Sequence, residues 1–424
     1  MRVQEQAVGW LRDRWPFRPE RWRSPLRGPW LTAVFGLVLL VALPIVAITG
    51  LLSYIAYGPQ FGQAIPGDVG WLRLPGFDWP THPAWLYQLT QGLHVGLGLV
   101  LVPVVLAKLW SVLPRLFAWP PVRSVTHLLE RLSVLLLVGS ILFEIVTGLL
   151  NIQYDYVFGF SFYTAHYYGA WVFMAALAAH LVIKFPALVA ALRSRSLRVE
   201  LRTSRADTRQ EPQDGGLVAT APTKPTISRR GALGVVAGGS LLVGVLSVGQ
   251  TVGWLRPLAL LVPRGLDPGD GPNGFPVNRT AAAAGITATD TGPAWTLQLT
   301  GTTRVALDRA GLAALPQHTA TLPIACVEGW STTQEWTGVR LRDLARLSGV
   351  DEPTAARVRS CERDGAFNSA MLQGNQVLDP DALLALLVNG ADLSPDHGYP
   401  ARVIVPALPG VHNTKWVRSI EFLT

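Results

Sequence analysis

Four of the eight histidines in this 424-residue sequence lie inside or at the ends of long apolar stretches. An imidazole is costly to place in hydrocarbon without a partner, so histidines at such positions are candidates for function. His166 and His180 are fourteen residues apart, close to four helical turns, which puts both rings on one face of a helix. Two stacked haem groups, each held by two imidazoles, need this spacing. The pattern predicts four haem ligands: His94, His127, His166 and His180.

A second group of candidate residues surrounds Cys326, one of two cysteines in the sequence; the other is Cys361. Two thiols alone build neither a disulfide framework nor a structural zinc site. The segment LPIACVEGWS, residues 322–331, places Cys326 at the end of an apolar strand that opens into a turn. A thiolate there would suit a high-valent metal, although a lone cysteine is more often a small buried hydrophobe.

The elements that must position these residues include five apolar stretches, each long enough to cross about 30 Å of hydrocarbon. Hydrophobic residues make up 49% of the sequence and charged residues 15%, which is more apolar than a soluble protein. Basic residues flank alternate ends of the stretches, so the net charge of +8 indicates topology rather than nucleic-acid binding. We predict a multi-pass protein of the cytoplasmic membrane, with a cytoplasmic amino terminus and an extracytoplasmic C-terminal domain. The stretches are residues 30–57, 85–106, 132–150, 160–183 and 232–255.

This topology also pairs the histidines. The second and fourth stretches both begin outside, so His94 and His166 lie toward that side and would hold an outer haem. His127 lies near the inner surface, where it would meet His180 and hold a second haem. The alternative is that the four side chains hydrogen-bond neighbouring helices, or that His127 and His166 lie at the membrane interface.

Between the fourth and fifth stretches, residues 194–228 are polar and are predicted to form a flexible cytoplasmic linker. Ser228-Arg229-Arg230-Gly231 then precedes a Gly- and Ala-rich apolar helix and resembles a twin-arginine export signal. The alternative is a pair of ordinary topology-determining arginines. The predicted organisation has five parts: a basic cytoplasmic segment 1–28, a four-helix di-haem cytochrome b membrane domain 29–193, the linker 194–228, the twin-arginine motif with the fifth helix 229–256, and an extracytoplasmic domain 263–424.

From residue 263 onward the pattern changes to short alternating runs. Residues 295–300 and 403–405 are predicted strands, and residues 341–347 and 381–388 are predicted helices. The fold class is therefore multi-domain: an all-α transmembrane bundle of five helices followed by a C-terminal α+β domain.

The order of motifs in this domain resembles the sulfite oxidase family of molybdopterin-binding domains over about residues 275–422. The motifs are WTLQLTG at 295–301, the Cys326 segment, WTGVRL at 336–341, DHGYPAR at 396–402 and Lys415-Trp416. The resemblance implies that Cys326 ligates molybdenum, with Glu328 and Trp330 as its catalytic neighbours. A dianionic phosphate needs cationic and N–H donors, and a pterin edge needs Asp and Asn partners. The implied cofactor contacts are Asn278, Asp392, His397, Arg402, Gly410, Val411, His412, Asn413 and Lys415.

Two features depart from the sulfite oxidases themselves. Glu328 lies where an anionic substrate would prefer cations, and no counterpart of their C-terminal dimerisation domain follows Phe422. Both features are more similar to the bacterial periplasmic methionine-sulfoxide reductases, whose catalytic subunit pairs with a haem-bearing membrane partner. Residues 30–192 resemble the cytochrome b subunits of formate dehydrogenases and the bacterial cytochrome b561 group, although their first helix usually supplies a ligand and residues 30–57 contain no histidine.

We therefore predict a membrane-bound, molybdenum-dependent oxidoreductase that moves an oxygen atom to or from a small or peptidyl substrate such as an S-oxide. Molybdopterin would carry the oxygen chemistry, and two b haems would exchange electrons with the quinone pool. The predicted partners are quinone, an oxide substrate, the lipid bilayer and the twin-arginine export machinery, with no nucleic acid. The alternatives are an electron-transfer cytochrome whose outer domain is a non-catalytic pterin-binding or docking module, and a transporter with histidine proton relays.

Overall fold

The computed structural model describes residues 19–61, 66–69, 72–73, 76–118, 122–153, 157–212, 216–266, 273–365 and 367–424. Most of the predicted basic segment 1–28 lies outside these residues. The chain divides into two compact units, and the boundary between them falls within several of the long helices. The helical unit comprises Met1–Ala47, Leu97–Thr147 and Tyr168–Gly244, and the C-terminal unit comprises Ile48–Gly96, Gly148–Tyr167 and Val245–Thr424.

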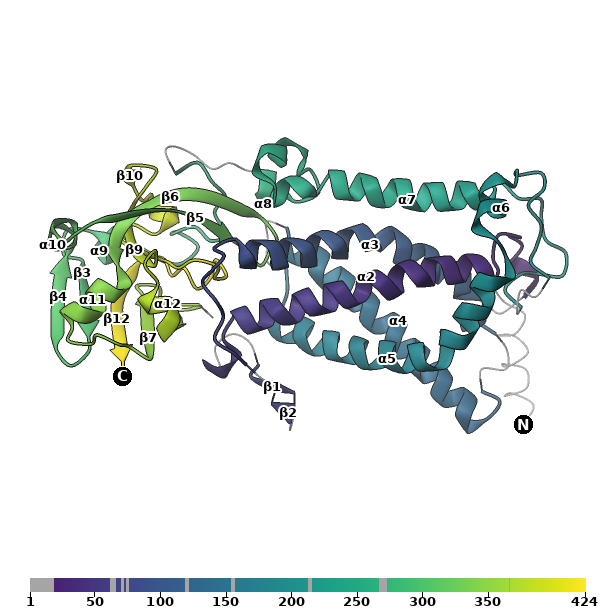
Figure 1. The fold of residues 1–424 in the computed structure, drawn as a ribbon, viewed down its shortest axis with the longest axis horizontal. Helices are drawn as coiled ribbons and strands as arrows, with labels where there is room; N and C mark the ends of the chain where they lie inside the picture. The colour runs from purple at the N-terminus through teal and green to yellow at the C-terminus, as the bar shows by residue number, and fades with distance from the viewer. Residues whose placement is uncertain are drawn as a thin grey trace. The chain divides into compact units, whose positions relative to one another are not determined.

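The helical unit is built from the long helices, which run alongside one another (Figure 1). Its core joins side chains from several of them, among them Leu31, Leu101, Phe173 and Leu233. These apolar faces pack together because each helix carries hydrophobic residues around most of its circumference. The helices are α2 Pro29–Ala56, α3 Leu86–Leu116, α4 Val125–Asn151, α5 Phe162–Ser194 and α7 Arg229–Val245, with the short α6 Leu197–Arg202 after α5.

Five described helices are long and apolar enough to cross a membrane by length and composition, as the sequence predicts. The fifth helix ends earlier than predicted. Its apolar run was expected to reach residue 255, but α7 ends at Val245 and two 3₁₀ helices follow, η3 Val248–Gln250 and η4 Gly253–Leu258. Pro257 and three glycines near this end, which are poor residues for a helix interior, account for the early stop.

The predicted linker 194–228 contains the short helix α6 and a few buried residues, although most of its described residues are exposed. Glu200 on α6 and Glu211 are buried, at 3% and 5% exposure, and both approach the side chain of Arg229. The oxygen-to-nitrogen distances are 3.4 Å from Glu200 and 3.7 Å from Glu211. Composition did not predict these contacts, because charged residues that would solvate a linker can also pair with one another in a buried cluster.

Two five-stranded sheets form the framework of the C-terminal unit (Figure 1). One has the order β10-β9-β6-β5, with β11 also paired to β9, and the other has the order β4-β3-β12-β7-β8. Strands β12 and β3 are parallel, and the remaining pairs are antiparallel. The strands are β3 Thr296–Thr300, β4 Arg304–Asp308, β5 His318–Ala325, β6 Ser331–Arg340, β7 Ala355–Ser360, β8 Ser369–Gln373, β9 Leu383–Val388, β10 Ala391–Asp392, β11 Arg402–Ile404 and β12 Val417–Leu423; a separate hairpin pairs β1 Asp68–Val69 with β2 Leu72–Arg73.

Short helices connect these strands and complete the described part of the unit. Helix α11 covers the predicted residues Leu341–Leu347, which confirms that prediction. The others are η2 Pro59–Phe61, α8 Pro263–Leu266, α9 Ala288–Thr291, α10 Arg309–Ala314, α12 Gly374–Leu378 and η6 Pro395–His397, and η1 Pro19–Arg21 lies in the helical unit.

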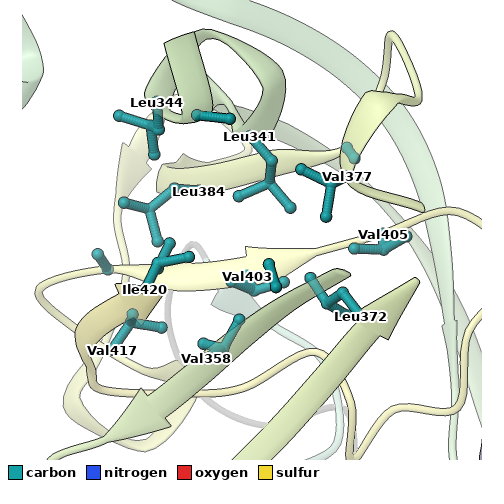
Figure 2. Close-up of a cluster of buried hydrophobic side chains, with 14 of the residues drawn as sticks. Leu341, Leu344, Val358, Leu372, Val377, Leu384, Val403, Val405, Val417 and Ile420 are labelled. Atoms are coloured by element: carbon teal, nitrogen blue, oxygen red, sulfur yellow. The ribbon is translucent and has the colours of Figure 1, made fainter. Parts of the chain in front are cut away.

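The main core of the C-terminal unit lies between the two sheets. Figure 2 shows Leu384 and Val403, from β9 and β11, near Val358 and Ile420, from β7 and β12. All four side chains are 1% exposed or less. Their burial is the main source of the unit's stability, at about 25 cal/mol for each Å² of apolar surface removed from water.

One predicted element of this unit has the wrong type. Residues 381–388 were expected to be helical, but Leu383–Val388 form β9, hydrogen-bonded to β6, β10 and β11. The strand is buried on both faces, and a short continuous apolar run gives no periodicity to separate such a strand from a buried helix. The predicted strands at 295–300 and 403–405 are confirmed as β3 and β11, each within one residue.

Candidate functional site

Cys326 lies in a tight loop, residues 326–330, that joins β5 to β6 and is called the cysteine loop below. The backbone N–H of Cys326 donates to Trp330 O at 2.9 Å, and the N–H of Gly329 donates to Cys326 O at 3.0 Å. Gly329 has φ of +94°, a conformation that favours glycine. The sequence CVEGW therefore closes on itself, and it holds the thiol at the end of a paired strand.

The thiol of Cys326 is buried, with the residue at 3% exposure. Burial, and then the nearby Glu328 carboxylate, raise the pKa of Cys326 above its usual value. Without a ligand the side chain is therefore a neutral thiol, whereas a metal ion bound there would favour the thiolate.

Glu328 is held by two donors next to this thiol. Arg264 Nε lies 3.2 Å from Glu328 Oε2, and Trp330 Nε1 donates to the same oxygen at 2.8 Å. Burial raises the pKa of Glu328 to about 7, and the charge of Arg264 opposes this shift. The predicted catalytic set, Cys326, Glu328 and Trp330, is thus one connected cluster, and sequence analysis missed its fourth member, Arg264.

A pocket opens beside Cys326 and gathers most of the predicted cofactor contacts. Seven predicted residues line it, and three apolar neighbours that were not predicted as contacts complete the wall. The predicted residues are Asn278, Cys326, Trp330, His397, Arg402, Gly410 and Lys415, and the neighbours are Phe275, Pro276 and Ile324.

Two buried cations meet in this pocket, and their described hydrogen bonds go to backbone carbonyls. Arg402 donates from Nε to Asn413 O and from Nη1 to His397 O, both at 3.2 Å. Lys415 Nζ donates to Arg279 O at 2.7 Å and to Asp396 O at 2.8 Å. Within the described ranges neither forms a salt bridge, and buried charges are normally paired.

Burial dominates the electrostatics of these side chains. Burial lowers the pKa of Arg402 to about 9, and burial together with Arg402 lowers the pKa of Lys415 well below its usual value. Burial, with smaller contributions from the same two cations, lowers the pKa of His397 to about 3. The ring of His397 lies 3.7 Å from that of Phe275, measured between centroids. The pocket is therefore built to accept negative charge.

Gly398 lets these side chains approach one another. It ends η6 with φ of +112°, and a Cβ there would lie 3.1 Å from Cβ of Lys415 and 3.3 Å from Cβ of Arg402. Sequence analysis did not single out this glycine, although its position directly after His397 in DHGYPAR was an available signal.

The structure places the other predicted contacts differently. Asp392 on β10 is absent from the pocket lining, and its side chain, 59% exposed, pairs with Arg309 at 2.5 Å. Val411 packs against the main core. His412 and Asn413 are buried, and burial lowers the pKa of His412 to about 4.

Asp396, which sequence analysis did not select, lies closer to the cations than Asp392. Its Oδ1 accepts from the backbone of Ala281 at 2.7 Å, and its backbone carbonyl is one of the two that bind Lys415. The position of Asp392 does not support its assignment as a cofactor contact, which the family resemblance implied.

The outer pair of histidines is brought together in the C-terminal unit. His94 on α3 and His166 on α5 have ring centroids 6.2 Å apart, with their planes at 86°. Phe162 stacks on His166 at 5.0 Å, and a Cβ at Gly50 would lie 2.8 Å from Cε1 of His94. The two side chains of the predicted outer pair are therefore neighbours, and their ligation of haem stays a prediction.

The inner pair has a different environment. His127 lies in the first turn of α4, where its Nδ1 is 3.2 Å from the backbone N of Arg123 and its Nε2 is 3.4 Å from Nε of Arg131. A neutral imidazole has one nitrogen that can accept, and an iron ion would need that same nitrogen, so either contact competes with ligation. Ligation by His127 and by His180, which lies in the middle of α5, stays a prediction.

Comparison with known proteins assigns the C-terminal region. Residues 284–424 match the family model described as oxidoreductase molybdopterin binding domain. The uncharacterized oxidoreductase YuiH of Bacillus subtilis (strain 168) is 33% identical over 131 residues, which cover 30% of this chain and 65% of that protein.

Two longer relatives agree with this match. The mitochondrial sulfite oxidase of Drosophila melanogaster is 34% identical over 135 residues, covering 26% of this chain and 24% of that protein. The NAD(P)H nitrate reductase of Hordeum vulgare is 39% identical over 101 residues, covering 22% of this chain and 11% of that protein. The chain thus spans less than two thirds of each of these relatives.

The matched region, with its buried thiol and its cationic pocket, is a molybdopterin-binding domain. More particularly, it is an oxidoreductase domain of the sulfite oxidase family, as the resemblance of its motifs predicts. The predictions for the apolar helices and their histidines lie outside the matched residues and stay predictions.

Proposed function

We propose that this chain is a membrane-bound molybdenum oxidoreductase that transfers an oxygen atom to or from a substrate such as an S-oxide, and that exchanges electrons with the quinone pool through b haem. The observation that carries the proposal is the pocket in which Cys326 lies beside Arg402 and Lys415, two buried cations that pair with backbone carbonyls.

The residues present fit molybdopterin. Arg402 and Lys415 would hold its phosphate, since charge-assisted hydrogen bonds to phosphate are the strong ones. Two further buried side-chain nitrogens, His412 Nε2 and Asn413 Nδ2, have no hydrogen-bond partner in the described part of the chain. Buried polar atoms are nearly always satisfied, so these nitrogens are consistent with a bound molecule rich in acceptors.

Cys326 would supply the thiolate ligand, and when bound the cofactor supplies oxygen-atom transfer. The protein orients the reacting groups. Trp330 and Arg264 fix the Glu328 carboxylate beside the cysteine loop, and the buried wall of Phe275 and Ile324 excludes water from the pocket. Water exclusion strengthens every electrostatic contact made there.

The pair His94 and His166 fits an iron ligated by two imidazoles. The two rings are close neighbours, with centroids 6.2 Å apart, and each imidazole could supply one nitrogen ligand. Haem b held there would supply one-electron exchange, and the five apolar helices would place it in the bilayer, with the amino terminus cytoplasmic and the domain of residues 263–424 outside. Export of the folded domain through the twin-arginine machinery, read from Arg229 and Arg230, belongs to the same proposal.

The test is a metal and haem census of the purified full-length chain, followed by a turnover assay. We expect equimolar molybdenum, a haem Soret band, and oxidation of the reduced haem by an S-oxide. In Cys326→Ser the haem spectrum should persist and oxide-driven oxidation should be lost. Absence of molybdenum from the wild-type chain would refute the proposal, and quinol-dependent haem reduction that needs neither Cys326 nor an oxide would favour an electron-transfer cytochrome with a non-catalytic outer domain.

A further inference from the structure

The cysteine loop is fastened to the first turns of α3, the helix that carries His94, and all of these residues belong to the C-terminal unit. Gln91 Nε2 donates a hydrogen bond of 2.7 Å to the backbone carbonyl of Val327. Val327 directly follows Cys326, and Gln91 precedes His94 by three residues, a little less than one helical turn. One hydrogen bond therefore joins the backbone next to the thiol to the turn of helix that carries a candidate haem ligand.

The orientation of the Gln91 side chain is determined by its partners. The carbonyl of Val327 can only accept, so the amide nitrogen must face it. The amide oxygen accepts from Ser53 Oγ at 2.8 Å, and Gln91 is 3% exposed. Both ends of the amide are thus used, and the side chain is held in one position between α2, α3 and the cysteine loop.

Neighbouring contacts hold the rest of this region without reaching the backbone next to the thiol. Thr251 Oγ1 donates to Gly329 O at 3.2 Å, and Gln88 Nε2 donates to Ser331 Oγ at 2.9 Å. Gln88 lies one turn before Gln91 and binds the first residue of β6. It therefore offers a matched comparison, because it is the same residue type on the same helix with a partner further along the chain.

We propose that Gln91 is a positioning residue for electron exchange between the molybdenum site at Cys326 and the haem site at His94, an inference that rests on the proposed function. With both cofactors bound, haem would supply electrons one at a time to the molybdenum site. Two electrons and two protons from water would there convert an S-oxide to a sulfide and water. Gln91 forms and breaks no covalent bond; its hydrogen bond keeps the cysteine loop seated on the haem-ligand helix and links the two sites.

The experiment compares Gln91→Leu and Gln88→Leu in the full-length chain loaded with both cofactors. The haem is reduced with dithionite, excess reductant is removed, and haem absorbance is followed after mixing with dimethyl sulfoxide. We expect Gln91→Leu to slow haem oxidation by about tenfold, the fold-change that matches the about 1.4 kcal/mol contributed by one hydrogen bond. Gln88→Leu should stay within about twofold of wild type, because the hydrogen bonds that it loses, to Ser331 Oγ and to the backbone carbonyl of Thr251, do not hold the backbone next to the thiol.

Three further readouts separate an electronic link from general damage: molybdenum and haem per chain, the midpoint potential of the haem, and turnover driven by reduced methyl viologen, which gives electrons to the molybdenum site directly. We expect all three to match wild type in Gln91→Leu. Haem oxidation at the wild-type rate, or a parallel fall in viologen-driven turnover, would overturn the inference.

If Gln91→Leu does not accumulate, Gln91→Asn is judged by the same criteria, because it keeps the amide but is too short to reach Val327. Failure of the proposed function is recognised separately: the wild-type chain would then lack haem or molybdenum, or its haem would not respond to the oxide.

Discussion

Replacement of Arg402 by glutamine should sharply reduce cofactor retention with little loss of apo-protein stability. The side chain has Nε and Nη1 engaged with backbone carbonyls, so Nη2 is the guanidinium nitrogen that remains for a phosphate among the described contacts. One to two charge-assisted hydrogen bonds at about 1.5–3 kcal/mol each would be lost. A loss of about 3 kcal/mol corresponds to about 150-fold weaker binding of the cofactor.

The apo-protein itself should tolerate this change. Burial lowers the pKa of Arg402 to about 9, which means that the folded protein disfavours its charge. A glutamine amide can still donate to one of the two carbonyls, and removal of an unpaired buried charge is often neutral or stabilising. We expect the thermal midpoint of the cofactor-free chain to change by less than about 4 °C, which is below the effect of 1 kcal/mol in a small domain.

The assay is molybdenum per chain, by elemental analysis, in protein made with limiting cofactor. Arg402→Lys is the matched control, because it keeps the charge and loses the planar fork, and it should fall between wild type and Arg402→Gln. Wild-type molybdenum content in Arg402→Gln would refute the assignment of this side chain to the phosphate. An equal loss of molybdenum and of apo-protein stability would refute the claim that the arginine serves the cofactor rather than the fold.

Three other outcomes follow from described contacts. Gly329→Ala should destabilise the C-terminal unit by at least about 1 kcal/mol, since its φ is +94° and its Cβ would lie 2.9 Å from atoms of Val95 and Gln250; an unchanged thermal midpoint would contradict this. Burial lowers the pKa of His397 to about 3 and that of His412 to about 4, so below about pH 6.5 the unfolded chain binds protons that the folded chain does not. The stability of the cofactor-free chain should therefore fall as the pH drops below this value, by up to about 1.4 kcal/mol per pH unit for each histidine. Thermal midpoints measured at roughly pH 7.5, 6 and 5 check this fall in stability, and His412→Gln is expected to reduce the dependence of stability on pH. Glu211→Gln breaks the buried pair with Arg229 and should destabilise the helical unit by about 3 kcal/mol. An equal thermal midpoint in this variant and in wild type would exclude a stabilising role for the pair.

The sequence predicted those parts of the site in which residues of suitable chemistry lie within a recognised motif. Cys326, His397, Arg402 and Lys415 all line one pocket, and each lies in a motif on which the family resemblance rests. Asp392 was assigned from the same resemblance, yet its side chain is exposed, whereas Asp396 and Gly398 contact the residues that line the pocket. Which side of a turn faces inward depends on backbone angles such as the φ of +112° at Gly398, which spacing alone does not reveal.

The fold was likewise predicted only in part. The presence of the long apolar helices was predicted, because hydropathy identifies them directly, but α3 and α5 continue beyond their predicted ends at residues 106 and 183 to Leu116 and Ser194. Strand β9 was taken for a helix because Leu383–Val388 is uniformly apolar, and its type is set by the strands on either side of it. Gln91 and Val327 are separated by 236 positions, and Arg264 and Glu328 are also far apart in the sequence, so no local pattern encodes these contacts.

The burial of Arg229 has a consequence for the biogenesis of the chain. Its guanidinium is 1% exposed and is enclosed by Glu200, Glu211 and the backbone carbonyls of Pro25 and Arg209. A receptor that reads both arginines can do so only before these segments have closed around the first of them. Recognition by the translocase would therefore have to precede the final assembly of the helices, and a finished molecule would not compete with newly made chains for the export apparatus.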